Sequence, residues 1–454
     1  MASLFNKRKE KIEQSGKKAS YQYENKFVDE LVEHYKARLL RDTNLEDLTR
    51  LSQGEMRLRI EQYVSQFMSE EKVIISRHDK EILITRILDE SVGYGPLEPL
   101  INDDSVTEIL INGWNEVYVE RLGKLDKTEI KFRNDEHVRH IVDRIVAPLG
   151  RRIDESSPMV DARLPDGSRV NAVISPVSLN GTLVSIRKFR KEPFKVEDLL
   201  QFHTLNSAMA EFLEGVVKAK LNTLISGGTG SGKTTILNVL AGNIPNGERV
   251  ITIEDSAELR LDRPNVVGLE GRPANVEGRG EITIRQLVRN ALRMRPDRII
   301  VGEVRSGEAF DMLQAMNTGH EGSLTTVHAN SADDALRRVE AMVTMSGVDL
   351  PSHIIREYIV GALDIIIQAT RLTDGTRKIV SISEVQKHQD GTYEVKEIYQ
   401  FKRIGMEADG TIKGYFTPTG NIPQCLERLK TFGINISKHA FTPSHTLMME
   451  KERA

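Results

Sequence analysis

Gly227-Gly228-Thr229-Gly230-Ser231-Gly232-Lys233-Thr234 is the stretch of sequence that decides the fold of this chain. It matches the P-loop pattern G-x-x-x-x-G-K-[ST], whose glycines let the backbone curl until its N–H groups point at phosphate oxygens. Lys233 is predicted to bring charge to the β- and γ-phosphates, and Thr234 a hydroxyl to Mg²⁺. A plain glycine-rich turn is the alternative, but an apolar run precedes the motif and a helical pattern follows it. The predicted nucleotide-binding residues are Gly228, Thr229, Gly230, Ser231, Gly232, Lys233, Thr234 and Thr235.

Around the P-loop, from about residue 206 onward, short apolar runs alternate with helical patterns. This alternation is typical of a parallel sheet with helices on both faces, so the fold class is predicted to be α/β. The predicted strands are 223–226, 250–254, 299–302, 324–328 and 365–369.

Upstream of this domain the pattern changes twice. Apolar residues between 27 and 92 recur at three- and four-residue steps, which indicates helices. Further on, 106–112, 117–120, 169–176 and 182–189 read as strands and 137–149 as a helix. The expected organisation is a basic flexible tail (1–22), a helical region (23–92), an α+β N-terminal domain (93–190), a linker (191–205), a P-loop ATPase domain (206–390) and a C-terminal hairpin and helical extension (391–454).

The tail allows two interpretations. Its six cations stand against only Glu10 and Glu13. A solvated, frayed segment is the prediction, and an electrostatic contact with anionic lipid or an acidic partner is the alternative.

Composition excludes several classes of protein. The chain has 454 residues, 39% of them hydrophobic and 28% charged, which rules out wholesale disorder. A net charge of −3 and 5% aromatic residues argue against a nucleic-acid binder. The single cysteine, Cys425, excludes an internal disulfide and a cysteine-clustered zinc site. No apolar run reaches 18 residues and none follows the basic N-terminus, so we expect neither a transmembrane span nor a signal peptide, and a cytoplasmic location.

Two strand ends carry acidic candidates. Residues 297–303 form an apolar strand that ends in Glu303, the candidate for orienting or activating the attacking water. No aspartate directly precedes Glu303, so this strand end offers no second acid to reach Mg²⁺. The alternative role of Glu303 is to cap the next helix. The run 251–258 is another strand that ends in acids, and one of Glu254, Asp255 and Glu258 is a weaker candidate for a place near Mg²⁺ or the water.

Histidines and arginines complete the candidate site. His320 and His328 lack a third metal ligand nearby, so hydrogen bonding of His328 toward the γ-phosphate is favoured over a zinc site. Arginine stabilises the charge of a transferring phosphoryl group. We expect two or three arginines of a larger set to contact the nucleotide. Arg289 and Arg293 are predicted to lie on one face of a helix. The set is Arg163, Arg169, Arg187, Arg289 and Arg293.

These motifs, taken in order, resemble the secretion ATPase superfamily, the hexameric motors of type II secretion, type IV pili and type IV secretion. The resemblance covers about residues 80–390. Its boxes are the P-loop, Ile253-Glu254-Asp255, Gly302-Glu303, and Thr318-Gly319-His320 followed by Thr326-Val327-His328-Ala329-Asn330.

Three upstream segments are similar to one branch of that superfamily, the CpaF-like assembly ATPases of Tad (Flp) pili. They are 94–100, 106–113 and 117–120. Two departures from the patterns of other branches also favour the Tad branch. A single cysteine forbids the four-cysteine zinc module usual in type II secretion motors, and the Ala-Ile-Arg-Asn-Leu-Ile run of pilus-retraction motors is missing.

The resemblance implies a RecA-like motor domain, preceded by a smaller α+β domain and an N-terminal helical region, in a homo-hexameric ring. ATP and Mg²⁺ would bind between the two domains. The catalytic residues implied by motif position are Lys233, Glu254, Glu303, His328, Arg169, Arg187, Arg289 and Arg293. The implied partners are inner-membrane platform proteins of a pilus or secretion apparatus, and the implied location is the cytoplasmic face of the bacterial inner membrane, reached through those partners.

The function implied is an ATP-hydrolysing motor that powers assembly of Tad pili. A motor of another type II or type IV secretion system is the first alternative. A RecA-like nucleic-acid motor and a scaffold that only binds nucleotide are the others; charge and aromatic content oppose the former, and intact Lys233, Thr234 and Glu303 oppose the latter. A GTPase is disfavoured because no Asn-Lys-x-Asp sequence occurs.

Overall fold

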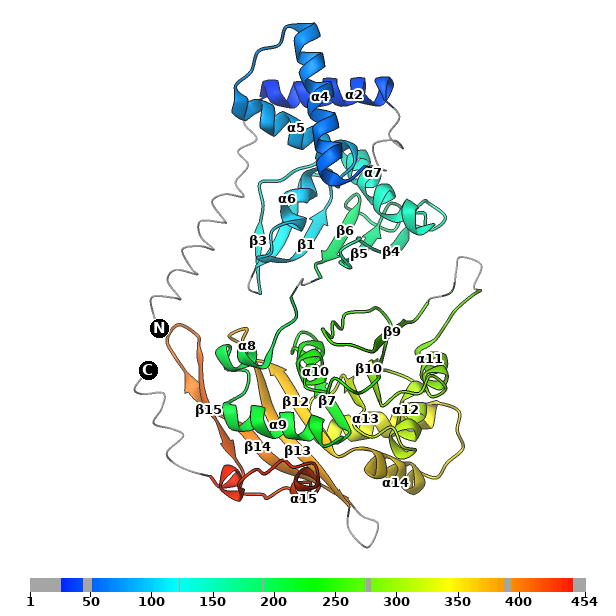
Figure 1. Ribbon diagram of the computed structural model, residues 1–454, viewed down its shortest axis with the longest axis vertical. Helices are drawn as coiled ribbons and strands as arrows, with labels where there is room; N and C mark the ends of the chain where they lie inside the picture. Colours follow the sequence, from blue (N-terminus) through cyan, green and yellow to red (C-terminus); the bar gives the residue numbers. More distant parts are fainter. Residues whose placement is uncertain are drawn as a thin grey trace. The chain divides into compact units, whose positions relative to one another are not determined.

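The computed structural model describes residues 26–43, 51–121, 123–189, 192–272, 274, 279–387 and 393–443. It divides into two compact units, Met1–Lys191 and Glu192–Ala454, which are described separately below (Figure 1). Within the described residues, none of the helices combines the length and the apolar character needed to cross a membrane.

The first unit begins with a small helical bundle, α2 (Lys26–Asp42), α4 (Gln53–Glu71) and α5 (Arg77–Ser91). Ser52 and Ser76 cap the N-termini of α4 and α5 with their side chains, as serine before an amphipathic helix predicts. The apolar stripes of the three helices meet around Tyr35, Phe67 and Ile87, which are almost fully buried.

An α+β module follows in the same unit. Its six-stranded antiparallel sheet has the order β3-β2-β1-β6-β5-β4. Helix α7 packs its apolar face against the sheet, and one hydrophobic core joins them. The elements are η1 (Gly95–Leu97), α6 (Glu98–Ile101), β1 (Val106–Asn112), β2 (Val117–Arg121), β3 (Lys124–Lys127), α7 (Asp135–Val146), η2 (Ala147–Leu149), β4 (Met159–Arg163), β5 (Arg169–Val173) and β6 (Leu183–Arg187).

The second unit is built on a nine-stranded sheet of order β15-β14-β13-β12-β7-β11-β10-β8-β9. The six strands from β12 to β9 are parallel, and β13, β14 and β15 extend them as an antiparallel meander. The strands are β7 (Thr223–Gly227), β8 (Val250–Glu254), β9 (Val266–Glu270), β10 (Arg298–Val304), β11 (Leu324–Val327), β12 (Ile365–Arg371), β13 (Arg377–Lys387), β14 (Tyr393–Met406) and β15 (Ile412–Pro418).

Helices cover both faces of this sheet, and each face has its own hydrophobic core. One core packs α9, α10 and α15 against the sheet, and the other packs α11, α12, α13 and α14. The predicted α/β class is therefore confirmed, with a RecA-like P-loop domain after a smaller α+β domain and a helical region. The helices are α8 (Val196–Gln201), α9 (Ser207–Lys218), α10 (Lys233–Gly242), α11 (Ile284–Ala291), α12 (Glu308–Asn317), α13 (Ala332–Met345), α14 (Ser352–Ala362), α15 (Leu426–Thr431) and η3 (Lys438–Phe441).

Two expected segments have more structure than their composition indicates. In the range 191–205, where a linker is expected, α8 forms and Leu199 and Leu205 are buried in the core of the second unit. In the range 391–454, the described strands β14 and β15 continue the central sheet. The tail 1–22 lies outside the described residues.

Candidate nucleotide-binding site

The P-loop joins the buried strand β7 to α10 in the middle of the parallel sheet. Gly230 and Gly232 have φ of +71° and +95°, a region that favours glycine. The hydroxyl of Ser231 donates a hydrogen bond to the carbonyl of Gly228 at 2.8 Å, and Lys233 Nζ donates to the same oxygen at 3.1 Å. The loop is thus closed on itself, with its lysine folded back across it.

The start of α10 is suited to bind an anion. The first N–H groups of a helix have no partner within it, and no side chain caps α10, whereas Asn206 caps α9 and Thr283 caps α11. A Cβ added to Gly228 would meet no atom within 4 Å, so there is open space beside the loop. These features fit the phosphates of a nucleotide, and Thr234, in the first turn of α10, fits as the hydroxyl ligand of an accompanying Mg²⁺.

Glu303 lies near the P-loop lysine. It stands on β10, separated from β7 only by β11, and the three strands are parallel. Burial lowers the pKa of Lys233, and the negative charge of Glu303 opposes this effect. The structure therefore brings together Lys233, which is predicted to bind the β- and γ-phosphates, and Glu303, which is predicted to activate the attacking water.

Arg305 and Asp255 belong to this cluster. Asp255 is one of the acids predicted to lie near Mg²⁺ or the water, whereas the sequence motifs did not single out Arg305. Arg305 Nη2 donates to Glu303 Oε2 at 2.8 Å, and its Nη1 lies 3.9 Å from Asp255 Oδ2. The hydrogen bond to Glu303 raises the pKa of Arg305. Arg305 directly follows the last residue of β10, two positions after Glu303, and this short separation was the only signal for it in the sequence.

Glu254 is buried and holds a loop. Its carboxylate accepts hydrogen bonds from the backbone N–H groups of Glu258 at 2.9 Å and Leu259 at 3.2 Å. A Cβ on Gly302 would lie 2.9 Å from Glu254 Cγ, so the ends of β8 and β10 are in close contact. This position is next to Glu303 in the fold, and its visible role is to fix the acidic loop that follows β8.

His328 directly follows β11, the strand beside the P-loop strand. Val327 pairs with Ser226 in the parallel register, so His328 lies at the same edge of the sheet as Gly227. Its carbonyl accepts a hydrogen bond from Arg338 of α13.

The predicted N-terminal-domain arginines form a row across three strands of the first unit. Arg163 on β4 is the register partner of Arg169 on β5, and Arg169 is the partner of Arg187 on β6. Arg187 in turn pairs with Glu108 on β1, with 3.9 Å between Nε and Oε1. Three like charges therefore lie side by side on one face of this sheet.

The prediction that Arg289 and Arg293 share one face of a helix is wrong. Helix α11 ends at Ala291, so Arg293 lies in the turn beyond it, and Arg285 takes its place on the face of Arg289. Both Arg285 and Arg289 donate through Nε, each at 2.7 Å, to the buried carboxylate of Asp311 on α12. Helix α11 packs on β8 and β9, at the edge of the sheet away from β7.

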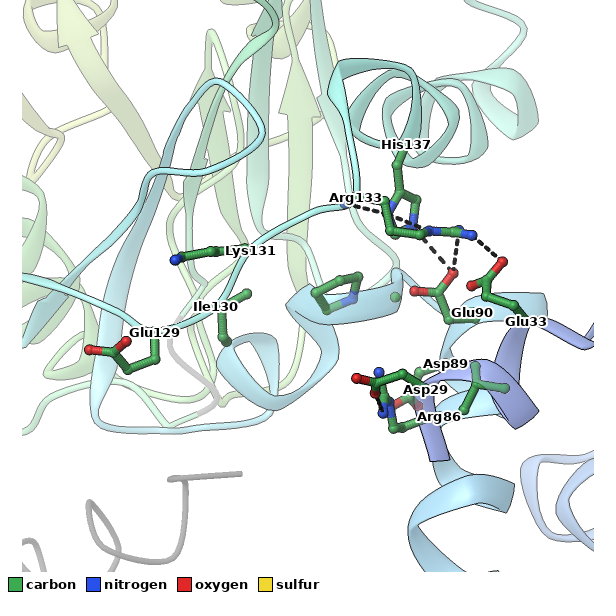
Figure 2. A pocket seen from close by; sticks show the side chains of 13 residues that line it. Asp29, Glu33, Arg86, Asp89, Glu90, Glu129, Ile130, Lys131, Arg133 and His137 are labelled. Atoms are coloured by element: carbon green, nitrogen blue, oxygen red, sulfur yellow. Dashed lines mark hydrogen bonds and ion pairs between the residues drawn. The ribbon is translucent and has the colours of Figure 1, made fainter. Parts of the chain in front are cut away.

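A hollow of about 380 Å³ lies inside the first unit, between the helical bundle and the α+β module. Figure 2 shows Glu90 at its wall, facing Arg133 and His137. Glu90 Oε2 is 2.8 Å from Lys36 Nζ and 3.2 Å from His137 Nε2. Burial alone would raise the pKa of Glu90, but these donors outweigh it and lower the pKa to about 2. Gly95 and Pro96, from the segment 94–100, line this hollow, but none of the predicted catalytic or nucleotide-binding residues does.

With this geometry established, the comparisons with known proteins place the chain in a family. The family model described as type II/IV secretion system protein matches residues 90–410, more than half of the chain. The chain belongs to this family.

Its members include well-matched relatives. A Mycobacterium tuberculosis protein named provisionally for conjugal transfer is 38% identical over 339 residues, which cover 73% of this chain and 95% of that one. The type IV secretion system protein VirB11 of Bartonella henselae is 32% identical, over 63% of this chain and 90% of that one. The solved VirB11 ATPase of the Brucella suis type IV secretion system, in complex with sulphate, is 30% identical, with coverage of 64% and 95% and a TM-score of 0.36.

Proposed function

We propose that this type II/IV secretion family member is an ATP-hydrolysing motor that powers assembly of Tad-type pili from the cytoplasmic face of the bacterial inner membrane. The observation that carries the ATPase part is the P-loop at the start of α10 with Glu303 next to Lys233. Relatives named as secretion ATPases support it.

Each residue of the site has a proposed task in hydrolysis. The N–H groups of the P-loop and Lys233 hold the β- and γ-phosphates, and Mg²⁺, when bound at Thr234, neutralises charge on their oxygens. Glu303 orients the attacking water and accepts its proton. Arg305 holds the Glu303 carboxylate in place through their 2.8 Å hydrogen bond. His328 hydrogen-bonds toward the γ-phosphate.

The ring and its arginines are part of the proposal. Arg169 and Arg187 reach the nucleotide from the α+β domain when the linker lets the two domains close. Arg289, over the far edge of the sheet, acts on the nucleotide of a neighbouring subunit in a homo-hexamer. Catalysis then needs packed neighbours, so specific ATPase activity should rise with protein concentration. Sedimentation and ATPase assays over one dilution series test this, and a fully active monomer would refute the ring.

A second candidate function is the motor of another type IV secretion system. It is favoured by relatives whose names refer to conjugal transfer and type IV secretion. Deletion of the gene in its own host, with complementation by wild type and by Lys233→Ala, separates the two. Loss of surface pili supports the Tad motor, whereas loss of DNA or effector transfer with normal pili supports the alternative.

A nucleic-acid motor is tested on the purified chain. The proposal expects ATPase activity that does not change when single- or double-stranded DNA is added. Strong stimulation by DNA would replace the pilus motor with a helicase-like function. Partners are proposed to be inner-membrane platform proteins, which the chain meets without crossing the membrane itself.

A further inference from the structure

A hairpin far along the sequence contacts the P-loop. Strand β12 runs beside β7, with Ala369 in register with Gly227, and so ends next to the P-loop. Arg377, the first residue of β13, donates from Nε to the carbonyl of Gly230 at 2.9 Å. A Cβ built on Gly230 would lie 3.7 Å from Nη1 of Arg371, the last residue of β12. Two arginines thus flank the phosphate-binding loop on the β12 side.

The two arginines stand directly opposite each other. Arg371 and Arg377 are register partners in the antiparallel pair β12–β13. Like charges in that position repel and weaken a sheet, unless an anion lies between them. Both side chains are exposed, so repulsion is damped by water but an incoming anion can reach them.

The turn that joins them is held in shape. Asp374 accepts hydrogen bonds from the N–H and the hydroxyl of Thr376 at 2.9 and 2.7 Å, and from the N–H of Ile412 on β15 at 2.9 Å. Gly375 supplies the positive φ of +84° that the turn requires. The arginines are therefore displayed by a preorganised hairpin, which lowers the entropy lost when they bind a ligand.

We propose that Arg371 and Arg377 form an arginine clamp that binds the phosphates of the nucleotide from the β12 side of the P-loop. Arg371 contacts phosphate oxygen, and Arg377 also positions the P-loop through Gly230. The guanidinium groups supply planar donors that match phosphate oxygens. The clamp rests on the proposed function, because it presupposes that the P-loop binds nucleotide.

The test measures nucleotide affinity and turnover separately in the full-length chain. Arg371→Gln, Arg377→Gln and the double variant are titrated with mant-ADP, and Arg403→Gln on the same sheet is the matched control. The clamp predicts that each single variant binds about tenfold more weakly, that the double variant is weaker still, and that Arg403→Gln is unchanged. Arg371→Lys should restore part of the affinity. KM for ATP should rise more than kcat falls for Arg371→Gln.

Melting without nucleotide separates binding from folding. Arg371→Gln should melt near the wild-type temperature, because the Arg371 side chain is exposed. Wild-type affinity in both single variants, with wild type itself binding mant-ADP, would overturn the clamp and leave the ATPase proposal intact. Absence of binding by wild type would overturn both. A lowered melting temperature in step with the lost affinity would also overturn the clamp and make the arginines structural.

Discussion

Arg169 and Arg187 are directly opposite each other on the paired strands β5 and β6, and Arg163 continues the row on β4. Cross-strand neighbours of like charge cost a sheet a few tenths of a kcal/mol to about 1 kcal/mol. Glu108 on β1 continues the row with an opposite charge at 3.9 Å from Arg187, and Glu120 on β2 is the register partner of Glu108. Such an arrangement is expected where a polyanionic ligand is bound.

Arg187→Ala should therefore lower ATP turnover by about tenfold or more while leaving stability nearly unchanged. The ion pair that it breaks is exposed and long, and the repulsion that it removes offsets the loss. An ATPase assay beside a thermal melt measures both, with the exposed Arg152→Ala as control. A large fall in melting temperature with a proportional loss of activity would make Arg187 a structural residue.

Two adjacent glycines of the P-loop should respond differently to alanine. A Cβ on Gly227 would lie 2.4 Å from Ser231 Oγ and 2.5 Å from the carbonyl of Ala369, whereas a Cβ on Gly228 meets nothing within 4 Å. Gly227→Ala should therefore lower stability by about 1–3 kcal/mol and abolish nucleotide binding. Gly228→Ala should melt like wild type but bind mant-ADP more weakly, since the methyl occupies space meant for phosphate. Equal melting of the two variants would contradict this.

Asp311→Asn should destabilise the second unit by about 1–3 kcal/mol. Its buried carboxylate is shared by Arg285 and Arg289, and an amide cannot satisfy two guanidinium groups in the same way. Urea unfolding measures the effect, and the exposed Asp349→Asn is the control. Unfolding midpoints that coincide for the two variants would show that the Arg285–Asp311–Arg289 contact contributes nothing.

The pH dependence of stability should change when Asp89 is replaced. Burial, followed by the charges of Glu98 and Glu90, raises the pKa of Asp89 to about 7. This pKa lies above that of an aspartate in the unfolded chain. The contribution of Asp89 to the free energy of unfolding is therefore fully present below about pH 4 and is lost as the pH rises to 7. Asp89→Asn should thus raise the free energy of unfolding by about 2 kcal/mol at pH 8, and by less at pH 5.

Chemical denaturation at the two pH values measures that difference. Glu129→Gln is the control, because Glu129 lines the same hollow and is exposed to solvent. The gain at pH 8 should be specific to Asp89. The same gain at both pH values would show that Asp89 does not titrate in this range.

Local pattern was enough to predict the centre of the second unit. The strands β7, β8, β10, β11 and β12 are short apolar runs, each buried on both faces, and the P-loop marks where one of them ends. Strands β3, β4 and β9 were missed. Every residue of β3 is exposed and β9 is only partly buried, so neither has the apolar signal of a core strand.

Contacts between distant segments could not be predicted from spacing. Arg377 follows Gly230 by 147 residues, and only the sheet order brings β12 beside β7. Arg293 was placed on a helix because it follows Arg289 by four residues. The chain leaves the helix after Ala291, and Arg295 has a φ of +54°, a turn that residue type does not reveal.

The most direct measurement is ATP binding and hydrolysis by Glu303→Gln beside Lys233→Ala. Glu303→Gln leaves the P-loop intact and removes the proton acceptor, so it should bind ATP with wild-type affinity while turnover falls by about 100-fold or more. Lys233→Ala should lose both binding and turnover, because the β- and γ-phosphates lose the P-loop charge. Hydrolysis by Glu303→Gln at near the wild-type rate would contradict the role of Glu303 and the mechanism built on it.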